Sequence, residues 1–492
     1  MAYDSLAFAA FLAVVAGCYQ LCPARWRRWY LIATSYTFYG MWSVGFALLL
    51  GSVTAIAYVV ARRVQDADDD RARRRWFNLG LVLLLLPLIT FKYASWLGGG
   101  LASLIGGPAW VSSLQAIRLL APVGISYYTL KLVGYLIDVY IGVESAGDFI
   151  GLATHAVFFP QILAGPIHRA GDFLKQIAEP KVPSAAMMGS GVRLILFGLF
   201  KKLVLADRLG LVVDQVFGRP DAFSGTLLAA ACYLFVIQVY MDFSGLTDIA
   251  IGAGRMFGIE APQNFDAPFF ARSIPEFWRR WHMTLTSWLT DYVFMPLRVA
   301  LRDLGQLGLV ISLMINMVLV ALWHGASWTF VAFGLVHGCY LAVSSLSQRP
   351  RQKLYAATGW DKIHPVTGPI VTFHLVVAGA VFFRAGSVRE AVHILQRVGA
   401  ALVDAVMHFG SGVAAQVASG VTQLNWGAQD AWIALGAAVL AETVHLLRRN
   451  GRSVSGVLAV PPWLRLGTAY ALAVAILLWG QAESKQFIYA QF

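Results

Sequence analysis

Hydrophobic residues occur along the chain in long runs separated by short polar and basic segments. The candidate runs are Ser5–Cys18, Trp29–Ala61, Phe77–Ile89, Leu119–Ile141, Ile150–Ala164, Val192–Leu205, Thr226–Tyr240, Leu307–Trp323, Thr329–Val343, Pro369–Phe383, Ala431–Leu447 and Leu466–Gly480. A helix that crosses a bilayer needs about 20 mainly apolar residues, so Trp29–Ala61 is long enough for two short ones. The pattern predicts an all-α polytopic membrane protein with about eleven spans.

Several of these runs are short or contain Gly or Pro. Such runs predict broken or re-entrant helices that are buried in protein or line a water-filled cavity. The segment Gly399–Gln429 is rich in Ala, Gly and Ser and only weakly apolar, so we expect it to connect helices at or outside the membrane surface. The pattern contains no tandem repeat and no soluble catalytic domain. We expect one integral membrane domain over residues 1–492, with N-terminal spans in residues 1–118.

Composition supports the membrane assignment. Hydrophobic residues make up 58% of the chain and charged residues only 13%, about half the charged fraction of a typical soluble domain. The four cysteines, Cys18, Cys22, Cys232 and Cys339, lie in apolar surroundings without metal-ligand spacing. They are expected to be small buried hydrophobic residues, and no metal site is expected.

The net charge of +12 follows the distribution of basic residues between the apolar runs. Arginines follow the first run and flank the segment after Ala61, namely Arg25, Arg27, Arg28, Arg62, Arg63 and those between 71 and 75. Basic loops stay in the cytoplasm, so the N-terminus is expected outside the cytoplasm. The positive charge is therefore expected to contact membrane lipids and not nucleic acid. The first run follows Asp4 and lacks a basic segment before it, so we expect a retained span and not a cleaved signal peptide.

An ionisable residue at the end of an uncharged run is the first candidate for chemistry. His324 directly follows the run Leu307–Trp323. A titratable group at membrane depth is costly and rare, and a neutral imidazole can accept a proton from a hydroxyl near neutral pH. Asn316 and Trp323 lie on or near the same helix face. Catalysis and a packing role, in which the imidazole bonds another helix, are both compatible with this pattern.

The segment Ser273–Tyr292 is predicted to be one amphipathic helix. Ser273 and Glu276 have the capping-box spacing, and the aromatic and leucine residues fall on one arc of about 120°. Such a helix suits the headgroup boundary, with Arg279 and Arg280 on its polar side. From spacing alone, His282 at the rim of the arc is better explained as a structural residue of an interfacial anchor.

Three further polar groups interrupt apolar sequence. Asp242, Ser244 and Asp248 either orient an imidazole or bind a substrate hydroxyl, or they cap a broken helix that glycines weaken. Lys201 and Lys202 either anchor a cytoplasmic helix end or contact the phosphates of a cytosolic acyl donor. His168 follows the turn Ala164–Ile167 and is expected to be interfacial and structural.

Together these segments resemble a known family, the membrane-bound O-acyltransferases, and within it the bacterial branch with the alginate O-acetyltransferase membrane subunit and the teichoic-acid D-alanyl transfer protein. The matching stretches are PVGISYYTLKLVGYLIDVY (122–140), FFPQILAGPIHRAGDFL (158–174), FGLFKKLVLADRL (197–209), YMDFSGLTDIAIGAGRMFGI (240–259), NFDAPFFARSIPEFWRRWHMTLTSWLTDYVFMPL (264–297), LWHGASW (322–328), VFFRA (381–385) and FIYAQF (487–492). The family core would therefore occupy residues 119–492.

The resemblance implies helices around a central tunnel and an acyltransferase activity. The histidine of the family's Leu-Trp-His-Gly segment maps onto His324, and that of its Trp-Arg-Arg-Trp-His segment onto His282. Both are therefore expected to be catalytic, with Asp242, Ser244, Asn316 and Trp323 orienting groups or lining the tunnel. Donor phosphates are expected to contact Arg279, Arg280, Lys201 and Lys202.

The expected reaction is transfer of an acetyl group from cytosolic acetyl-CoA, a substrate and not a tightly bound cofactor, to an extracytoplasmic polysaccharide such as alginate. An extracytoplasmic acetyltransferase-like partner protein is expected to pass the group on, and the location implied is the bacterial inner membrane. Two alternatives stay open. One is D-alanyl or acetyl transfer to teichoic acid, cellulose or peptidoglycan. The other is a proton-coupled transporter with relay histidines, although inverted repeats are not evident.

Overall fold

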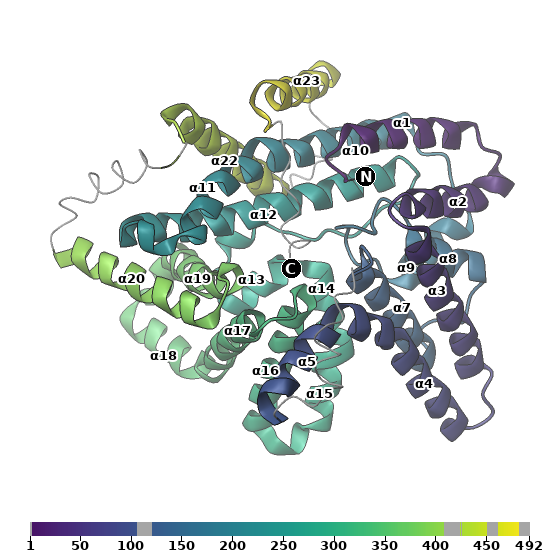
Figure 1. The fold of residues 1–492 in the computed structure, drawn as a ribbon, viewed down its shortest axis with the longest axis horizontal. Helices are drawn as coiled ribbons and strands as arrows, with labels where there is room; N and C mark the ends of the chain where they lie inside the picture. The colour runs from purple at the N-terminus through teal and green to yellow at the C-terminus, as the bar shows by residue number, and fades with distance from the viewer. Residues whose placement is uncertain (1, 106–120, 408–423, 425, 450–460, 482–492) are drawn as a thin grey trace. The chain divides into compact units, whose positions relative to one another are not determined.

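Every regular element that the structure describes is a helix (Figure 1). The computed structural model describes residues 2–105, 121–407, 424, 426–449 and 461–481. Within these residues, seven helices are long and apolar enough to cross a membrane. They are Val44–Gln65, Asp70–Gly99, Gly225–Arg255, Arg302–His324, Trp328–Leu346, Trp360–Arg384 and Ala428–Leu447, and the shorter apolar helices are Leu6–Leu21 and Trp463–Trp479. The all-α polytopic class is confirmed.

Besides the runs that form the two shorter apolar helices, three predicted runs do not form long apolar helices, and Trp29–Ala61 gives one long helix, Val44–Gln65, and not two. The run Ile150–Ala164 contains only α8 (Phe149–Val157), after which the chain turns. The run Leu119–Ile141 contains α7 (Ile125–Tyr140), and Val192–Leu205 falls within α10 (Ala185–Leu199) and the π-helical turn η3 (Phe200–Ala206). Proline and glycine shorten α8, whereas the paired lysines interrupt the third run. The central tunnel stays an expectation.

The chain forms two compact units. Unit 1 comprises Met1–Ile195 and Leu246–Pro262, and unit 2 comprises Leu196–Gly245 and Gln263–Phe492. These limits differ from the boundary expected near residue 118, and the one-domain organisation stays a prediction.

Unit 1 is built around packed N-terminal helices. Its elements are α1 (Leu6–Leu21), α2 (Arg27–Gly40), α3 (Val44–Gln65), α4 (Asp70–Leu88), the π-helical turn η2 (Ile89–Tyr93), α5 (Ala94–Ile105), α7, α8, α9 (Ala170–Ala178) and most of α10. Helix α3 packs on α4, α7 and α8. Gly80 permits the close approach, because a Cβ there would lie 2.6 Å from side-chain atoms of both Val60 and Leu136. His168 is buried in protein, and its carbonyl lies 2.9 Å from Nε2 of His155; its interfacial depth stays a prediction.

Unit 2 contains the helices that carry both candidate histidines. Its helices are α11 (Asp207–Gly218), the first part of α12 (Gly225–Arg255), α13 (Ile274–Arg280), α14 (Met283–Leu289), α15 (Met295–Ala300), α16 (Gly305–His324), α17 (Trp328–Leu346), α18 (Gln348–Thr358), α19 (Trp360–Arg384), α20 (Val388–Met407), α22 (Ala428–Arg449) and α23 (Pro462–Trp479). Helix α17 packs on α16, α19 and α13. Gly334 makes the α16 contact close, since a Cβ there would lie 2.7 Å from the Cα of Val318.

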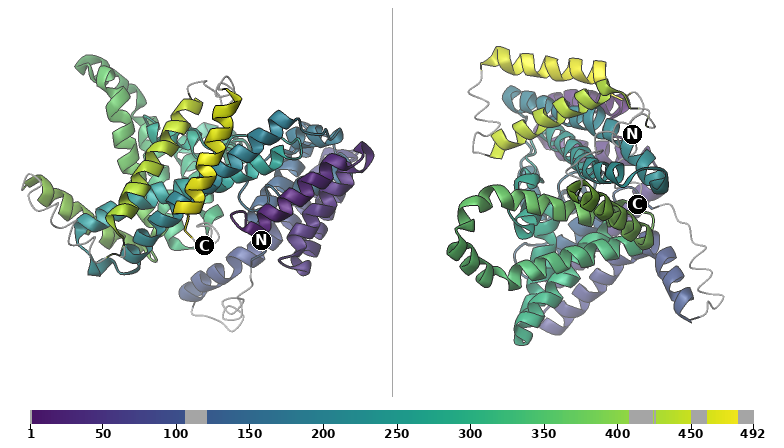
Figure 2. Two further views of the ribbon diagram at one scale, coloured as in Figure 1. Left: turned by 90° about the horizontal axis from the view of Figure 1, so that it is seen from above. Right: turned by 90° about the vertical axis from the view of Figure 1, so that its left-hand side faces the viewer.

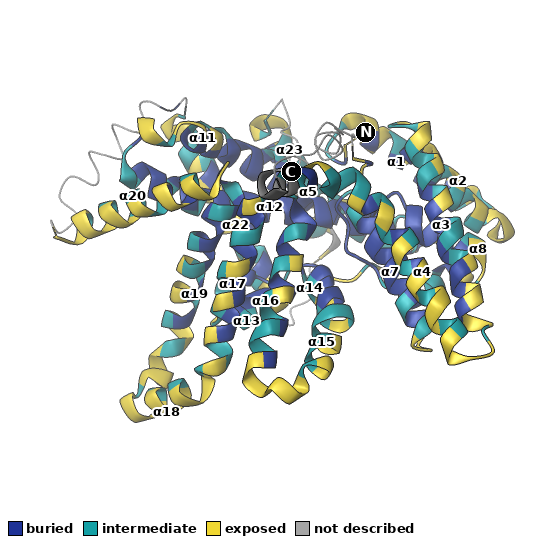
Figure 3. Ribbon diagram, turned by 60° about the horizontal axis from the view of Figure 1, so that its bottom comes forward, coloured by how far each residue is buried: buried dark blue, intermediate teal, exposed yellow. Residues whose placement is uncertain are grey.

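Helix α12 is longer and more buried than the pattern predicts. Its predicted apolar run ends at Tyr240, but the helix continues to Arg255. Figure 3 shows α12 mainly in the buried colour, whereas α18 has no buried residue. A buried helix of this length provides a scaffold on which polar residues beyond Tyr240 face protein instead of lipid.

The C-terminal helices α22 and α23 are the yellow-green and yellow elements of Figure 2. Both pack on η3. The predicted connection Gly399–Gln429 begins inside α20, which extends to Met407, whereas residues 408–423 and 425 lie outside the described residues. The motif at 487–492 also lies outside them.

Candidate active site

His324 is the last residue of α16, and only 4% of the residue's surface is exposed. The predicted run Leu307–Trp323 differs from the observed helix by a few residues at its start and by His324 at its end. The helix ends because Gly325 adopts an extended conformation, with φ −168°. A Cβ on Gly325 would collide with the ring of Phe330. Glycine at this point therefore lets α17 begin one short turn later, where Ser327 accepts a hydrogen bond from the Phe330 amide.

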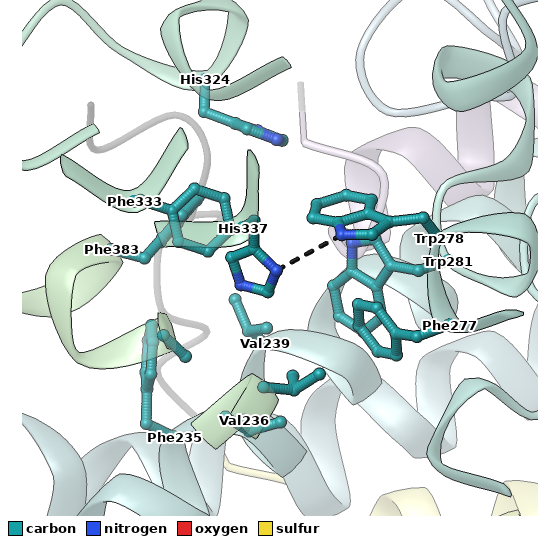
Figure 4. Close-up of a pocket in the computed structure, with 12 residues that line it drawn as sticks. Phe235, Val236, Val239, Phe277, Trp278, Trp281, His324, Phe333, His337 and Phe383 are labelled. Atoms are coloured by element: carbon teal, nitrogen blue, oxygen red, sulfur yellow. Dashed lines mark hydrogen bonds between the residues drawn. The ribbon is translucent and has the colours of Figure 1, made fainter. Parts of the chain in front are cut away.

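His324 lines a pocket with a mainly aromatic and aliphatic wall (Figure 4). The other lining residues are Phe235, Val236, Val239, Phe277, Trp278, Trp281, Phe333, His337, Val376, Ala380 and Phe383. They come from α12, α13 and the residue after it, α17 and α19. The cavity volume is about 40 Å³, which is enough for a few water molecules. A pocket this apolar strengthens polar interactions with the few polar groups that face it.

His282 lies between α13 and α14 in a left-handed backbone conformation, with φ 43° and ψ 52°. This conformation is uncommon for a residue with a side chain and is costly unless neighbouring contacts hold it. The predicted continuous helix Ser273–Tyr292 is therefore wrong, because the chain breaks here into two seven-residue helices. The predicted N-cap is correct, since Ser273 accepts a hydrogen bond from the Glu276 amide.

Asn264 explains why the helix breaks. Its carbonyl accepts from the Met283 amide at 2.9 Å, and its Oδ1 accepts from the Thr284 amide at 3.2 Å. These two amides begin α14 and would otherwise bond inside a continuous helix. A distant residue thus supplies the acceptors that make the turn at His282 possible.

The apolar face of this segment packs against protein. Phe277, Trp278, Leu285 and Trp288 are buried in the structure. They were expected to face the headgroup boundary, but they are buried in protein, and Phe277 and Trp278 line the pocket of His324. The segment is amphipathic as predicted, but its apolar face packs against other parts of the protein.

The two candidate histidines lie close together. Their ring centres are 6.4 Å apart. The ring of Trp323 lies edge-on to His282 at 5.3 Å and to His324 at 5.0 Å, and Phe243 of α12 lies 4.7 Å from His282. The aromatic neighbours restrict both imidazoles. Burial lowers the pKa of His282 to about 3, because the imidazolium loses its hydration.

Lys201 and Lys202 are both buried on η3. Lys202 Nζ lies 2.8 Å from Asp207 and 3.1 Å from Asp242, whereas Lys201 donates to Ser244 Oγ at 3.0 Å. The structure thus joins two pairs of candidate residues into one buried polar cluster. Contacts of these lysines with donor phosphates stay a prediction. The alternative, that they anchor a helix end at the cytoplasmic surface, does not fit, because both side chains are buried.

The remaining candidates have different environments. Arg279 is exposed, and Arg280 forms an ion pair with Glu276 one turn earlier. Asn316 is buried on α16, and Trp323 contacts both histidine rings. Their proposed roles stay predictions. No group of three or more His, Cys, Asp or Glu side chains that could hold a metal occurs within the described part of the chain.

Sequence reasoning missed two polar residues of this region. His337 lines the pocket, and its Nδ1 accepts a hydrogen bond from Trp278 Nε1 at 3.3 Å (Figure 4). Asn264 contacts His282. His337 lies 13 positions after His324 on the next helix, so the packing of α16 on α17 was needed to bring them to one pocket. Neither residue had a spacing that marked it.

Comparison with known proteins decides the family. Residues 145–385 match the model of the family described as membrane-bound O-acyltransferase. The chain is also 34% identical, over 76% of its length and 73% of the relative's, to the probable alginate O-acetylase AlgI of Azotobacter vinelandii. The chain belongs to the membrane-bound O-acyltransferase family. This membrane-bound O-acyltransferase places both histidines of the predicted family motifs at one site.

Relatives of this acyltransferase differ in the acceptor that their names give. A peptidoglycan O-acetyltransferase of Helicobacter pylori is 29% identical over 76% of this chain and 73% of its own length. A teichoic acid D-alanyltransferase of Streptococcus thermophilus is 29% identical over 63% and 72%. The chain is therefore a multi-pass membrane O-acyltransferase, and the likeness extends well beyond the short histidine motifs.

Proposed function

We propose that this acyltransferase takes an acetyl group from cytosolic acetyl-CoA for O-acetylation of an extracytoplasmic polysaccharide such as alginate. The observation that carries the proposal is the pairing of His324 and His282 at the buried end of a membrane helix, beside an apolar pocket. The relative named alginate O-acetylase, which aligns over three quarters of this chain, supports acetyl as the group and a polysaccharide as the acceptor.

His324 acts as the general base in the proposed reaction. It takes the proton of the acceptor hydroxyl while the hydroxyl oxygen forms a bond to the thioester carbon. When the carbon–sulfur bond breaks, the proton returns from His324 to the sulfur, which gives the ester and free CoA thiol. The aromatic pocket excludes bulk water, which protects the thioester from hydrolysis and strengthens each polar contact.

The donor phosphates contact Arg279, Arg280, Lys201 or Lys202 in this proposal. Arg279 is the candidate best suited, because its side chain is exposed and a guanidinium binds phosphate through two parallel hydrogen bonds. The acceptor hydroxyl belongs to the polysaccharide or to an extracytoplasmic partner protein that passes the acetyl group on. The proposed location is the bacterial inner membrane, where cytosolic donor and external acceptor approach from opposite faces.

A His324→Ala protein tests the mechanism. We expect acetyl transfer to fall by about 10² to 10⁴-fold, the usual contribution of a general base, while the amount of inserted protein is unchanged. His374→Ala is the matched control, because His374 is exposed and its ring bonds a carbonyl of its own helix. The readouts are acetyl transfer from labelled acetyl-CoA by purified protein and ester content of the cell's exopolysaccharide. Unchanged ester content in the inserted His324→Ala strain would reject the catalytic role.

The donor has its own test. A relative named teichoic acid D-alanyltransferase makes D-alanine the second candidate group. Purified protein that transfers D-alanine from a loaded carrier protein, but no acetyl from acetyl-CoA, would replace the acetyl proposal with this one.

A further inference from the structure

The hydrogen bonds around Asn264 fix the protonation of a catalytic candidate. Asn264 Oδ1 accepts from the Thr284 amide at 3.2 Å and from Thr284 Oγ1 at 2.8 Å. A backbone amide can only donate, so the amide of Asn264 is oriented with its oxygen toward this group. The same oxygen lies 3.1 Å from Nδ1 of His282.

This geometry selects one tautomer of His282. Because the atom facing Nδ1 is an acceptor, Nδ1 carries the proton. In a neutral imidazole the other nitrogen, Nε2, then keeps a bare lone pair. Burial favours the neutral form of this ring, with a pKa near 3. His282 is 1% exposed, and its Nε2 has no hydrogen-bond partner in the described structure.

A buried acceptor without a hydrogen bond is costly, because it has lost its hydration, and native structures rarely leave one without a reason. His324 lies nearby, with 6.4 Å between ring centres. A direct hydrogen bond between two imidazoles needs about 5.2 Å or less between centres, so the observed spacing is too long for one and suits a single oxygen atom between the rings. A water molecule or a hydroxyl is such an atom.

We propose that Asn264 is a positioning residue, which holds His282 with Nδ1 protonated and Nε2 bare so that His282 accepts a hydrogen bond through one oxygen from His324. The inference rests on the proposed function for the step it serves. When one ring nitrogen of His324 takes the proton of the acceptor hydroxyl, the N–H on its other nitrogen donates more strongly to the intervening oxygen, which in turn donates to His282 Nε2. The positive charge is thereby shared between the rings, and the proton then returns to the thiolate sulfur.

Two charged groups on the elements that adjoin His282 form ion pairs of their own. On α12, Asp242 lies 3.1 Å from Lys202. At the end of α13, Arg280 pairs with Glu276. From α16, the titratable neighbour is His324 itself. A new charge at position 264 is therefore the most direct way to change the protonation of His282.

Asn264→Asp tests the inference, because aspartate keeps the shape and the acceptor oxygen but adds a negative charge. That charge favours the imidazolium and raises the pKa of His282. We expect His282 to become protonated at a pH higher by about one unit or more, which ¹⁵N NMR of histidine-labelled protein follows directly, with KM for acetyl-CoA little changed. Gln263→Glu is the charge-matched control, since Gln263 is exposed one residue earlier, and its His282 signal should titrate as in the unmodified protein. An unmoved titration of His282 in a folded Asn264→Asp protein would overturn the positioning role.

A second measurement does not depend on turnover. Solid-state NMR of protein labelled with ¹⁵N-histidine distinguishes the two tautomers, and a difference spectrum against His282→Asn assigns the signal. We expect protonated Nδ1 and bare Nε2. The opposite tautomer overturns the inference even if acetyl transfer is found. Conversely, the expected tautomer in a protein that transfers no acetyl group retains the role of Asn264 and rejects only the proposed donor.

Discussion

At the scale of single residues, one buried lysine of unit 2 stabilises two buried carboxylates. Lys202 is 1% exposed and contacts both Asp207 and Asp242, which are 2% and 3% exposed. Each carboxylate would pay a large desolvation cost without this cation. The cluster lies on a π-helical turn, a distortion that occurs often near functional sites. Asp242 is adjacent to Phe243, which packs on His282, so the charge cluster also fixes one side of the candidate active site.

Replacing Lys202 tests this support. Lys202→Met keeps most of the side-chain length but removes the cation that contacts two buried carboxylates, so we expect a loss of about 3 to 5 kcal/mol in the free energy of unfolding. Thermal unfolding in detergent, followed by the loss of helical signal, measures it. Arg302→Gln is the control, because its pair with Asp303 is exposed on both sides and such pairs contribute about 0 to 1 kcal/mol. Equal melting temperatures for the two variants would contradict the structural role of Lys202.

Whole elements were predictable where the pattern is local. The run Leu307–Trp323 lies inside α16, which is bounded by Gly305 and His324, because an uncharged apolar sequence has few alternatives to a helix in lipid. Ser273 was correctly placed as an N-cap from its spacing to Glu276. In both cases the residues that decide the structure lie within one or two turns of each other.

The break between α13 and α14 could not be predicted in the same way. Helical periodicity continues through Trp281 and His282, and nothing in the local sequence favours a turn. The deciding contacts come from Asn264, which is 18 and 20 residues away from the side chains that it bonds. Likewise, His337 reaches the pocket only because α17 packs against α16. The histidine motifs identified the two candidate catalytic residues. Tertiary contacts determine which residues surround them and how they are protonated.

The left-handed residue between these helices leads to a prediction at the same scale. After glycine, asparagine is among the residues that best tolerate φ near 43°, whereas β-branched residues are among the worst. We expect His282→Asn to retain the melting temperature of the unmodified protein within a few degrees while acetyl transfer falls by about 10²-fold or more. His282→Val should also lose about 1 to 3 kcal/mol of stability from backbone strain. A stable His282→Val protein would show that the turn is not strained in solution.

The orientation of the whole molecule follows from how its arginines are distributed. Helix α3, Val44–Gln65, is one of the long apolar helices, with Arg62 and Arg63 in its last turn. The arginines at 71 and 73–75 follow within the first turns of α4. Short loops rich in arginine remain in the cytoplasm, so the end of α3 should face inward. The turn before α3 should then face outward, on the same side as the N-terminus.

Cysteine labelling in intact cells tests this orientation. In a background with all four native cysteines replaced by alanine, Met41→Cys before α3 should react with a membrane-impermeant maleimide that has reached the outer face of the inner membrane. Asp68→Cys after α3 should react only once that membrane is opened. Both positions are exposed, Met41 at 59%, so a difference in labelling reports the side of the membrane and not burial. Because α3 separates the two positions, one of them must label first. Labelling of Asp68→Cys before Met41→Cys would invert the proposed orientation of α3.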